Sequence, residues 1–222
     1  ALARWQHVQL GPISPVEFVA LARHAGLIRP LTFGILEQAL SQVALWRRHD
    51  PSLSVSVNVT ADLLAEEDFA AQVKESLDRH GLSTDALILE ITESQHLVSD
   101  RRTRDSVLRL AAAGIVLSID DFGTGYSALS YLQNLPVGEV KIDRSFVTPM
   151  AQHPGDRAIV EGTVKLLHSV GLRVVAEGIE TIEVWDLLAE LGCYAGQGYL
   201  MSKPIPADEA AVWAVQPAWS RD

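Results

Sequence analysis

The chain contains 222 residues, of which 48% are hydrophobic and 21% are charged, so it is long enough to bury a sizeable core within one large domain. Its net charge of −10 argues against a DNA or RNA polymer or an anionic membrane surface as partner, so an anionic ligand would need local positive charge. The single cysteine, Cys193, cannot form an internal disulfide, and no apolar run reaches the length of a membrane span. We therefore expect a cytoplasmic domain, either free or as the cytoplasmic part of a membrane protein.

Short apolar runs alternate with amphipathic segments from one end of the chain to the other. The apolar runs predict strands at residues 1–5, 53–59, 86–91, 115–119, 139–142, 173–176 and 194–199. A first helix is predicted to begin at Ser14-Pro15, where Glu17 would complete a capping box. Further helices are predicted around residues 36–46, 67–80, 101–113, 128–135, 156–170, 181–191 and 207–213. Repeated strand–helix–strand order with strands that are apolar on both faces indicates a parallel sheet covered by helices.

Polar side chains stand at the C-terminal ends of six successive predicted strands. They are Asn58, Glu90, Asp120 with Asp121, Lys141 with Asp143, Glu177, and Gln197. In an open doubly wound sheet, functional residues gather at one or two switch points, whereas every strand of an eight-stranded barrel ends at the same central mouth. The sequence therefore predicts an α/β fold of the TIM-like (β/α)8 barrel type, with the functional site at this mouth.

The residues at this mouth have the chemistry of a divalent-cation site. Asn58, Glu90 and Asp120 offer hard oxygen ligands, which favour Mg²⁺ or Mn²⁺, or Ca²⁺ in a larger cavity. Adjacent anions repel, so Asp120 and Asp121 can both stay ionised only if cations lie against them. Two cations about 3.5 to 4 Å apart are the usual clamp for phosphodiester hydrolysis, and Lys141 would add a fixed positive charge beside them. Two glycines after the pair, Gly123 and Gly125, would let a loop approach the cations closely.

Each feature taken alone also has a structural explanation. The paired aspartates could cap a turn, Glu90 and Glu93 could lie on a solvated face, and Lys141 could form an internal ion pair with Asp143. Lys141 could also be the Schiff-base lysine of an aldolase-like barrel, which would be indifferent to chelators. The joint placement of these residues at successive strand ends favours the cation site over the alternatives.

The motifs that carry these residues resemble those of the EAL domain family of bacterial cyclic di-GMP phosphodiesterases. The matching stretches cover nearly the whole chain and include Val55–Val59, Leu89–Glu93, Asp120–Ser127, Lys141–Asp143, Ala176–Glu180 and Gln197–Tyr199. The resemblance implies Mg²⁺- or Mn²⁺-dependent hydrolysis of one phosphodiester of cyclic di-GMP, which gives linear pGpG. A receptor that binds cyclic di-GMP without turnover is the alternative.

The resemblance also implies a role for each matching residue. Asn58, Glu90 and Asp120 would bind a first metal ion, and Asp120, Asp121 and Glu177 a second. The catalytic residues would be Lys141, which positions water, Glu177, and Glu93, which anchors the loop of residues 121–127. The substrate-binding residues would be Leu2, Arg4, Asp143 and Gln197.

The sequence departs from the family at its first residue. The family's signature triplet is Glu-Ala-Leu, whereas this sequence starts at Ala1-Leu2. We therefore expect residues 1–222 to be an N-terminally truncated phosphodiesterase domain that lacks the family's first, antiparallel strand and one ligand of the first metal. The resemblance further implies a homodimer that pairs near residues 128–135, and sensor or diguanylate cyclase domains upstream.

Overall fold

The computed structural model describes residues 1–92, 101–125 and 135–215. Its centre is a sheet of six strands, all parallel and hydrogen-bonded in the order in which they occur in the sequence. The strands are β3 (Val55–Asn58), β4 (Leu87–Thr92), β5 (Val116–Phe122), β6 (Glu139–Ile142), β7 (Arg173–Glu177) and β8 (Ala195–Gln197). Because the strands are parallel, all six C-terminal ends meet at one rim of the sheet.

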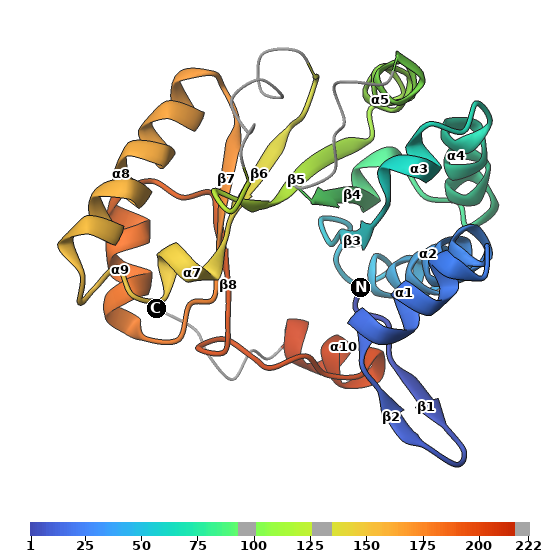
Figure 1. The fold of residues 1–222 in the computed structure, drawn as a ribbon, viewed down its shortest axis with the longest axis horizontal. Coiled ribbons are helices and arrows are strands. Elements are labelled where there is room, and N and C mark those ends of the chain that lie inside the picture. The colour runs from blue at the N-terminus through green and yellow to red at the C-terminus, as the bar shows by residue number, and fades with distance from the viewer. Residues whose placement is uncertain (93–100, 126–134, 216–222) are drawn as a thin grey trace.

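Helices connect the strands, and most of them lie on the outside of the curved sheet (Figure 1). They are α1 (Pro15–His24), α2 (Ile28–Trp46), α3 (Ala61–Leu64), α4 (Phe69–Arg79), the short 3₁₀ helix η1 (Thr84–Ala86), α5 (Arg101–Ala112), α7 (Arg144–Val147), α8 (Pro154–Ser169), α9 (Ile182–Glu190) and α10 (Ala207–Val215). None of the helices in the described residues is both long and apolar enough to cross a membrane. A curved parallel sheet with helices on its convex side confirms the predicted TIM-like (β/α) architecture.

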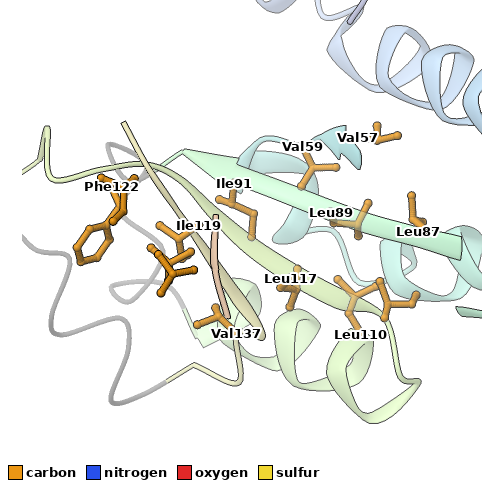
Figure 2. Packing of buried hydrophobic residues seen from close by; sticks show 14 of the residues in the cluster. Val57, Val59, Leu87, Leu89, Ile91, Leu110, Leu117, Ile119, Phe122 and Val137 are labelled. Atoms are coloured by element: carbon orange, nitrogen blue, oxygen red, sulfur yellow. The ribbon is translucent and has the colours of Figure 1, made fainter. Parts of the chain in front are cut away.

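The hydrophobic core lies between the sheet and its outer helices. Alternate side chains of a strand point to opposite faces, so Leu87, Leu89 and Ile91 of β4 share one face. These three are almost fully buried and pack with Leu117 of β5 and Leu110 of α5 (Figure 2). The intervening residues of the same strands, which include Glu90 and Asp120, point to the concave face of the sheet. This alternation positions the polar residues inside the curve of the sheet.

Glycines mark the ends of four of the predicted helices. Gly81, Gly114, Gly171 and Gly192 follow helices α4, α5, α8 and α9, and all four have positive φ angles between 65° and 85°. Helix α1 starts at Pro15, as predicted. The expected capping box is wrong in one detail, because within the described residues the Ser14 side chain makes no capping hydrogen bond.

The strand predicted at residues 1–5 is wrong. The chain instead forms a separate antiparallel hairpin, in which β1 (Trp5–His7) pairs with β2 (Gly11–Ile13). Two backbone N–H groups of the turn, those of Gln9 and Leu10, donate to Nδ1 of His7, and Gly11 has a φ of 74°. This local turn lets residues 5–7 pair with their own neighbours. In the described residues β3 therefore has one ladder partner, β4, and the terminal ammonium of Ala1 donates to the Ser56 carbonyl of β3.

Candidate active site

The pairing register brings the predicted site residues to one rim of the sheet. Asn58 of β3 lies opposite Glu90 of β4, and Thr92 of β4 lies opposite Asp120 of β5. Glu177 is the last residue of β7 and lies opposite Gln197 of β8. The predicted polar residues thus lie at one rim, at or within two residues of the C-terminal ends of the six strands, although β5 and β6 themselves end in Phe122 and Ile142.

Lys141 lies at the centre of this group. Its ammonium nitrogen Nζ is 3.0 Å from Oε1 of Glu90 and 3.3 Å from Oδ1 of Asp120, and it forms a third, closer ion pair with Oε1 of Glu177. The Lys141 side chain is only 7% exposed, so these three contacts take the place of water. The alternative of an internal ion pair between Lys141 and Asp143 is wrong, because Lys141 pairs with carboxylates from three other strands.

Burial and neighbouring charges shift the pKa values in this group. Burial alone would lower the pKa of Lys141, but Glu90, Glu177 and Asp120 together raise it above its usual value. Burial also raises the pKa of Glu177, although Lys141 opposes that change. For Asp121, burial and the charge of Asp120 raise the pKa, and Lys141 lowers it. Lys141 therefore stays protonated at neutral pH. Its positive charge does not fully offset the effects that raise the pKa values of Asp121 and Glu177, so an additional cation would stabilise their ionised forms.

Three carboxylates of the rim are spaced to share a metal ion. Asp120, Asp121 and Glu177 each offer an oxygen within 4.8 Å of the others. Carboxylate oxygens are the ligands that Mg²⁺, Mn²⁺ and Ca²⁺ prefer, so this donor set fits such an ion. Asp121 has a φ of 56°, in the left-handed region that few non-glycine residues adopt, and the pairing of β5 with β6 is irregular between Ile119 and Phe122. This interruption of the regular strand breaks the alternation that would direct the side chains of Asp120 and Asp121 to opposite faces.

Two other residues predicted to be ligands, Asn58 and Glu90, are linked to each other. Nδ2 of Asn58 donates to Oε2 of Glu90 at 3.3 Å. Glu90 is buried, and its other carboxylate oxygen, Oε1, faces Lys141. Asn58 and Glu90 thus lie beside the Lys141 cluster, with the side-chain nitrogen of Asn58 directed at Glu90.

Helix α7 braces the loops that follow β5 and β7. A Cβ atom on Gly123, after β5, would lie 2.9 Å from Cε2 of Phe146, and one on Gly178, after β7, would overlap Cβ of Arg144. Both glycines have positive φ values, 102° and 72°, so side chains are excluded there for conformational reasons as well. The two loops therefore hold Asp121 and Glu177 in place by close backbone approach to α7.

Asp143, predicted to bind substrate, begins α7 instead. Its Oδ1 accepts from the backbone N–H of Ser145 at 3.0 Å, which is the capping interaction of a helix N-terminus. Asp143 also lies near enough to Asp121 to raise its pKa. A structural role for Asp143 is established, and substrate binding by Asp143 remains a prediction.

The other residues predicted to bind substrate line one cavity. Leu2, Arg4 and Gln197 belong to the wall of a cavity of about 1470 Å³, which also involves residues of α1, α2 and the segment 204–210. Within the described residues, its wall does not include the carboxylates that surround Lys141. The guanidinium of Arg4 donates to the carbonyl of Ala3 at 2.9 Å, and both Leu2 and Arg4 are exposed. The structure brings these three residues together, and their contact with a substrate remains a prediction.

Some predictions concern residues outside the described part of the chain. Glu93, Tyr126, Ser127 and the predicted helix at residues 128–135, apart from Leu135, fall in this category. The anchoring role of Glu93, and pairing through the helix, remain predictions.

One buried acidic residue, Glu139, was missed by the sequence analysis. It precedes Lys141 by two positions on β6, shares its face of the sheet, and lies opposite both Ser118 and Arg173. Nη2 of Arg173 approaches Oε2 of Glu139 to 3.7 Å, and its guanidinium lies over the ring of Tyr194. Burial raises the pKa of Glu139, which the Ser118 hydroxyl and Arg173 oppose. The two-residue spacing from Lys141 was the signal that could have revealed this inward-facing carboxylate.

Comparison with known proteins relates the whole arrangement to one family. The profile of the EAL domain matches residues 1–204. The chain is 39% identical over 96% of its length to a protein of Pseudomonas aeruginosa named cyclic di-GMP phosphodiesterase PA2567, of which it covers 36%. It is 40% identical over 94% of its length to the bifunctional diguanylate cyclase/cyclic di-GMP phosphodiesterase MucR of the same organism, of which it covers 31%. The chain thus spans about a third of the length of these curated relatives.

A solved structure shares the fold of this chain and a substantial part of its sequence. The phosphodiesterase PaMucR, in complex with c-di-GMP, superposes with a TM-score of 0.86 at 39% identity, over 93% of this chain and 84% of that one. This degree of likeness extends over nearly the whole of the fold described above. The chain therefore belongs to the EAL domain family.

Proposed function

We propose that residues 1–222 act as a phosphodiesterase domain that hydrolyses cyclic di-GMP to linear pGpG with the help of two divalent cations, Mg²⁺ or Mn²⁺. The observation that carries this proposal is the convergence of carboxylates from β4, β5 and β7 on a buried rim around Lys141. The names of the relatives support the substrate, because PA2567 and MucR are both named as cyclic di-GMP phosphodiesterases.

The family resemblance supplies the ligand set proposed for the first cation, and the spacing of three carboxylates supports the set proposed for the second. Asn58, Glu90 and Asp120 would hold one cation, and Asp120 would share the second with Asp121 and Glu177, which lie within ligand-sharing distance of it. When bound, the cations supply Lewis-acid activation of water and neutralise charge on the phosphate. In this hydrolysis the oxygen of water forms a new bond to phosphorus, one P–O bond to a sugar breaks, and the released sugar oxygen takes up a proton to become a hydroxyl, so that the ring opens to a linear dinucleotide with a terminal phosphate.

Lys141 contributes charge in this proposal. Because its pKa is raised, Lys141 is protonated at neutral pH and cannot accept a proton from water. Its ammonium can instead donate hydrogen bonds that orient a water molecule or a phosphate oxygen at the rim. Leu2, Arg4 and Gln197 would contact the nucleotide from the neighbouring cavity, with Arg4 as the positive charge that an anionic ligand needs.

The proposal is tested by assaying the purified protein with cyclic di-GMP in the presence of Mg²⁺ or Mn²⁺. We expect linear pGpG on chromatography, with no product after addition of a chelator or in the variants Glu90→Ala and Asp120→Asn. Glu75→Gln is the matched control, since Glu75 lies on the exposed surface of α4 and should leave turnover unchanged.

Two outcomes would replace the proposed function. Tight binding of cyclic di-GMP by wild-type protein without any product would indicate the receptor alternative. Turnover that resists chelators, together with trapping of a carbonyl substrate on Lys141 by borohydride, would indicate the Schiff-base alternative. The family resemblance also leads us to propose a homodimer and upstream sensor or diguanylate cyclase domains, and sedimentation of the protein at several concentrations tests the first of these.

A further inference from the structure

We propose that Lys141 is an internal cation that holds the site's carboxylates together and has to leave them when divalent cations bind. This inference rests on the proposed function, because it concerns the same rim. It assigns to Lys141 a role before the reaction starts, in addition to its role beside the reacting phosphate. Binding of metal then becomes an exchange of one protein cation for two ions.

The contacts of Lys141 involve the same carboxylates that the cations need. Nζ pairs with Oε1 of Glu177 and lies 3.3 Å from Oδ1 of Asp120, and both residues belong to the triplet that is spaced to share an ion. Nζ also lies 3.0 Å from Oε1 of Glu90. An ammonium and a divalent cation cannot both occupy the space between the same oxygens, because their like charges repel and both require direct contact.

The neighbouring residue Asn58 is arranged in the same way. Its Nδ2, a hydrogen-bond donor, points to Oε2 of Glu90, whereas a metal ion requires the amide oxygen. Both carboxylate oxygens of Glu90 therefore face nitrogen donors from the protein, one from Asn58 and one from Lys141. Binding a cation at Glu90 requires the Asn58 amide to turn and the ammonium of Lys141 to move.

Burial gives this exchange its energetic consequence. The side chains of Glu90, Asp120 and Glu177 are between 8% and 16% exposed, so without a nearby cation their charges would repel in surroundings with little water. Removing the charge of Lys141 should lower the stability of the metal-free protein, because the carboxylates then repel one another. It should also tighten metal binding, because no ammonium competes with the cations for the carboxylates.

The experiment measures Mn²⁺ binding, without substrate, to wild type, Lys141→Met and the control Lys74→Met. Lys74 is an exposed lysine of α4 that pairs with Asp78, so its replacement tests for a general effect of lost positive charge. We expect Lys141→Met to bind Mn²⁺ at least tenfold more tightly than wild type by calorimetry. In a chelator the variant should have a lower melting temperature than wild type, and added Mn²⁺ should raise its melting temperature by more than it raises that of wild type. Lys74→Met should match wild type in all three measurements.

The outcomes separate this inference from the proposed function. Absence of Mn²⁺ binding by wild type would overturn the proposed function itself. Binding by wild type with equal or weaker binding by Lys141→Met would overturn only the exchange. If Lys141→Met fails to fold, crystal structures of the wild type with and without Mn²⁺ decide the question. We expect Nζ to lie beyond about 4 Å from Glu177 when Mn²⁺ is bound, and an ammonium that keeps its contacts with Glu90 and Glu177 beside the ion would overturn the inference.

Discussion

The ammonium of Lys141 lies 3.0 Å from Oε1 of Glu90, although β5 separates their strands in the sheet. The sheet is curved (Figure 1), and the two long side chains reach across β5 to meet each other. Glu90 thus has two duties, as a partner of Lys141 and as a proposed metal ligand.

Replacing Glu90 with glutamine should affect turnover far more than folding. Lys141 keeps its contacts with Asp120 and Glu177, so we expect the free energy of unfolding to fall by only about 1–2 kcal/mol. We expect the rate of pGpG formation to drop at least about a hundredfold, because a neutral amide replaces a charged ligand. Urea denaturation and initial rates measure the two effects, and a Glu90→Gln protein with wild-type rates would contradict the metal assignment.

Asp121→Asn should stabilise the metal-free protein at neutral pH while abolishing turnover. Asparagine tolerates the positive φ of 56°, and it removes a carboxylate whose pKa is raised above the usual 3.8. Because the pKa of Asp121 is higher in the folded than in the unfolded protein, ionisation of this carboxyl opposes folding. The wild type therefore has its full stability below pH 3.8, where Asp121 is neutral, and loses this contribution as the pH rises through the folded pKa. We expect the variant to be more stable than the wild type at pH 7, by a margin that solvent screening keeps small, and to have no advantage near pH 3.5.

The measurement for Asp121→Asn is urea denaturation at both pH values in the presence of a chelator. Added Mn²⁺ should reverse the order, so that the wild type becomes the more stable protein. A variant that is less stable than wild type at pH 7 without metal would show that Asp121 is held by favourable contacts in the folded state.

Gly178→Ala should destabilise the protein and also impair the site. The new methyl group would overlap Cβ of Arg144, and the backbone has a φ of 72°. We expect a loss of about 2–4 kcal/mol in the free energy of unfolding, and a fall in turnover at temperatures where the variant is folded, since Glu177 is the preceding residue. Gly162→Ala is the control, because a Cβ atom at this position of α8 would meet no atom within 4 Å, and it should be neutral or slightly stabilising. Equal stability of the two variants would contradict a close approach at α7.

Cys193 should react slowly with thiol reagents in the folded protein. Burial raises its pKa from 9.0 to about 11, so at pH 8 its thiolate population should be about a hundredfold lower than in the unfolded chain. Alkylation at pH 8, with and without denaturant, measures this difference, and raising the pH toward 11 should speed the reaction of the folded protein. Equal rates in the two states would contradict the burial of the thiol.

The residues at the rim of the site could be predicted because the sequence shows where each strand ends. An apolar run that stops at Asn58, Glu90 or Glu177 marks where a strand leaves the core, and parallel strands place all such ends on one edge. That reasoning needs no distances. It therefore predicts which residues lie at the rim and says nothing of which ones touch.

The contacts within the rim could not be predicted from the sequence. The distance between Lys141 and Glu90 depends on how strongly the sheet curves, which in turn depends on the packing of all the outer helices. Glu139 was missed for a related reason, since it stands at the start of an apolar strand, where a polar residue usually faces solvent. The strand expected at residues 1–5 was wrong because the turn at Gly11 offers a local partner, and apolar composition does not reveal which partner a segment pairs with.

The alternation along β4 has a consequence for how such a domain can change over generations. Leu89 and Ile91 face the helices, whereas Glu90 between them faces the rim. Substitutions at the positions that face the helices alter the stability of the fold, and substitutions at the positions that face the rim alter the chemistry of the site. Selection can therefore adjust durability and reactivity separately within one short segment, and the same barrel can lose its catalytic power or acquire a new ligand without being rebuilt.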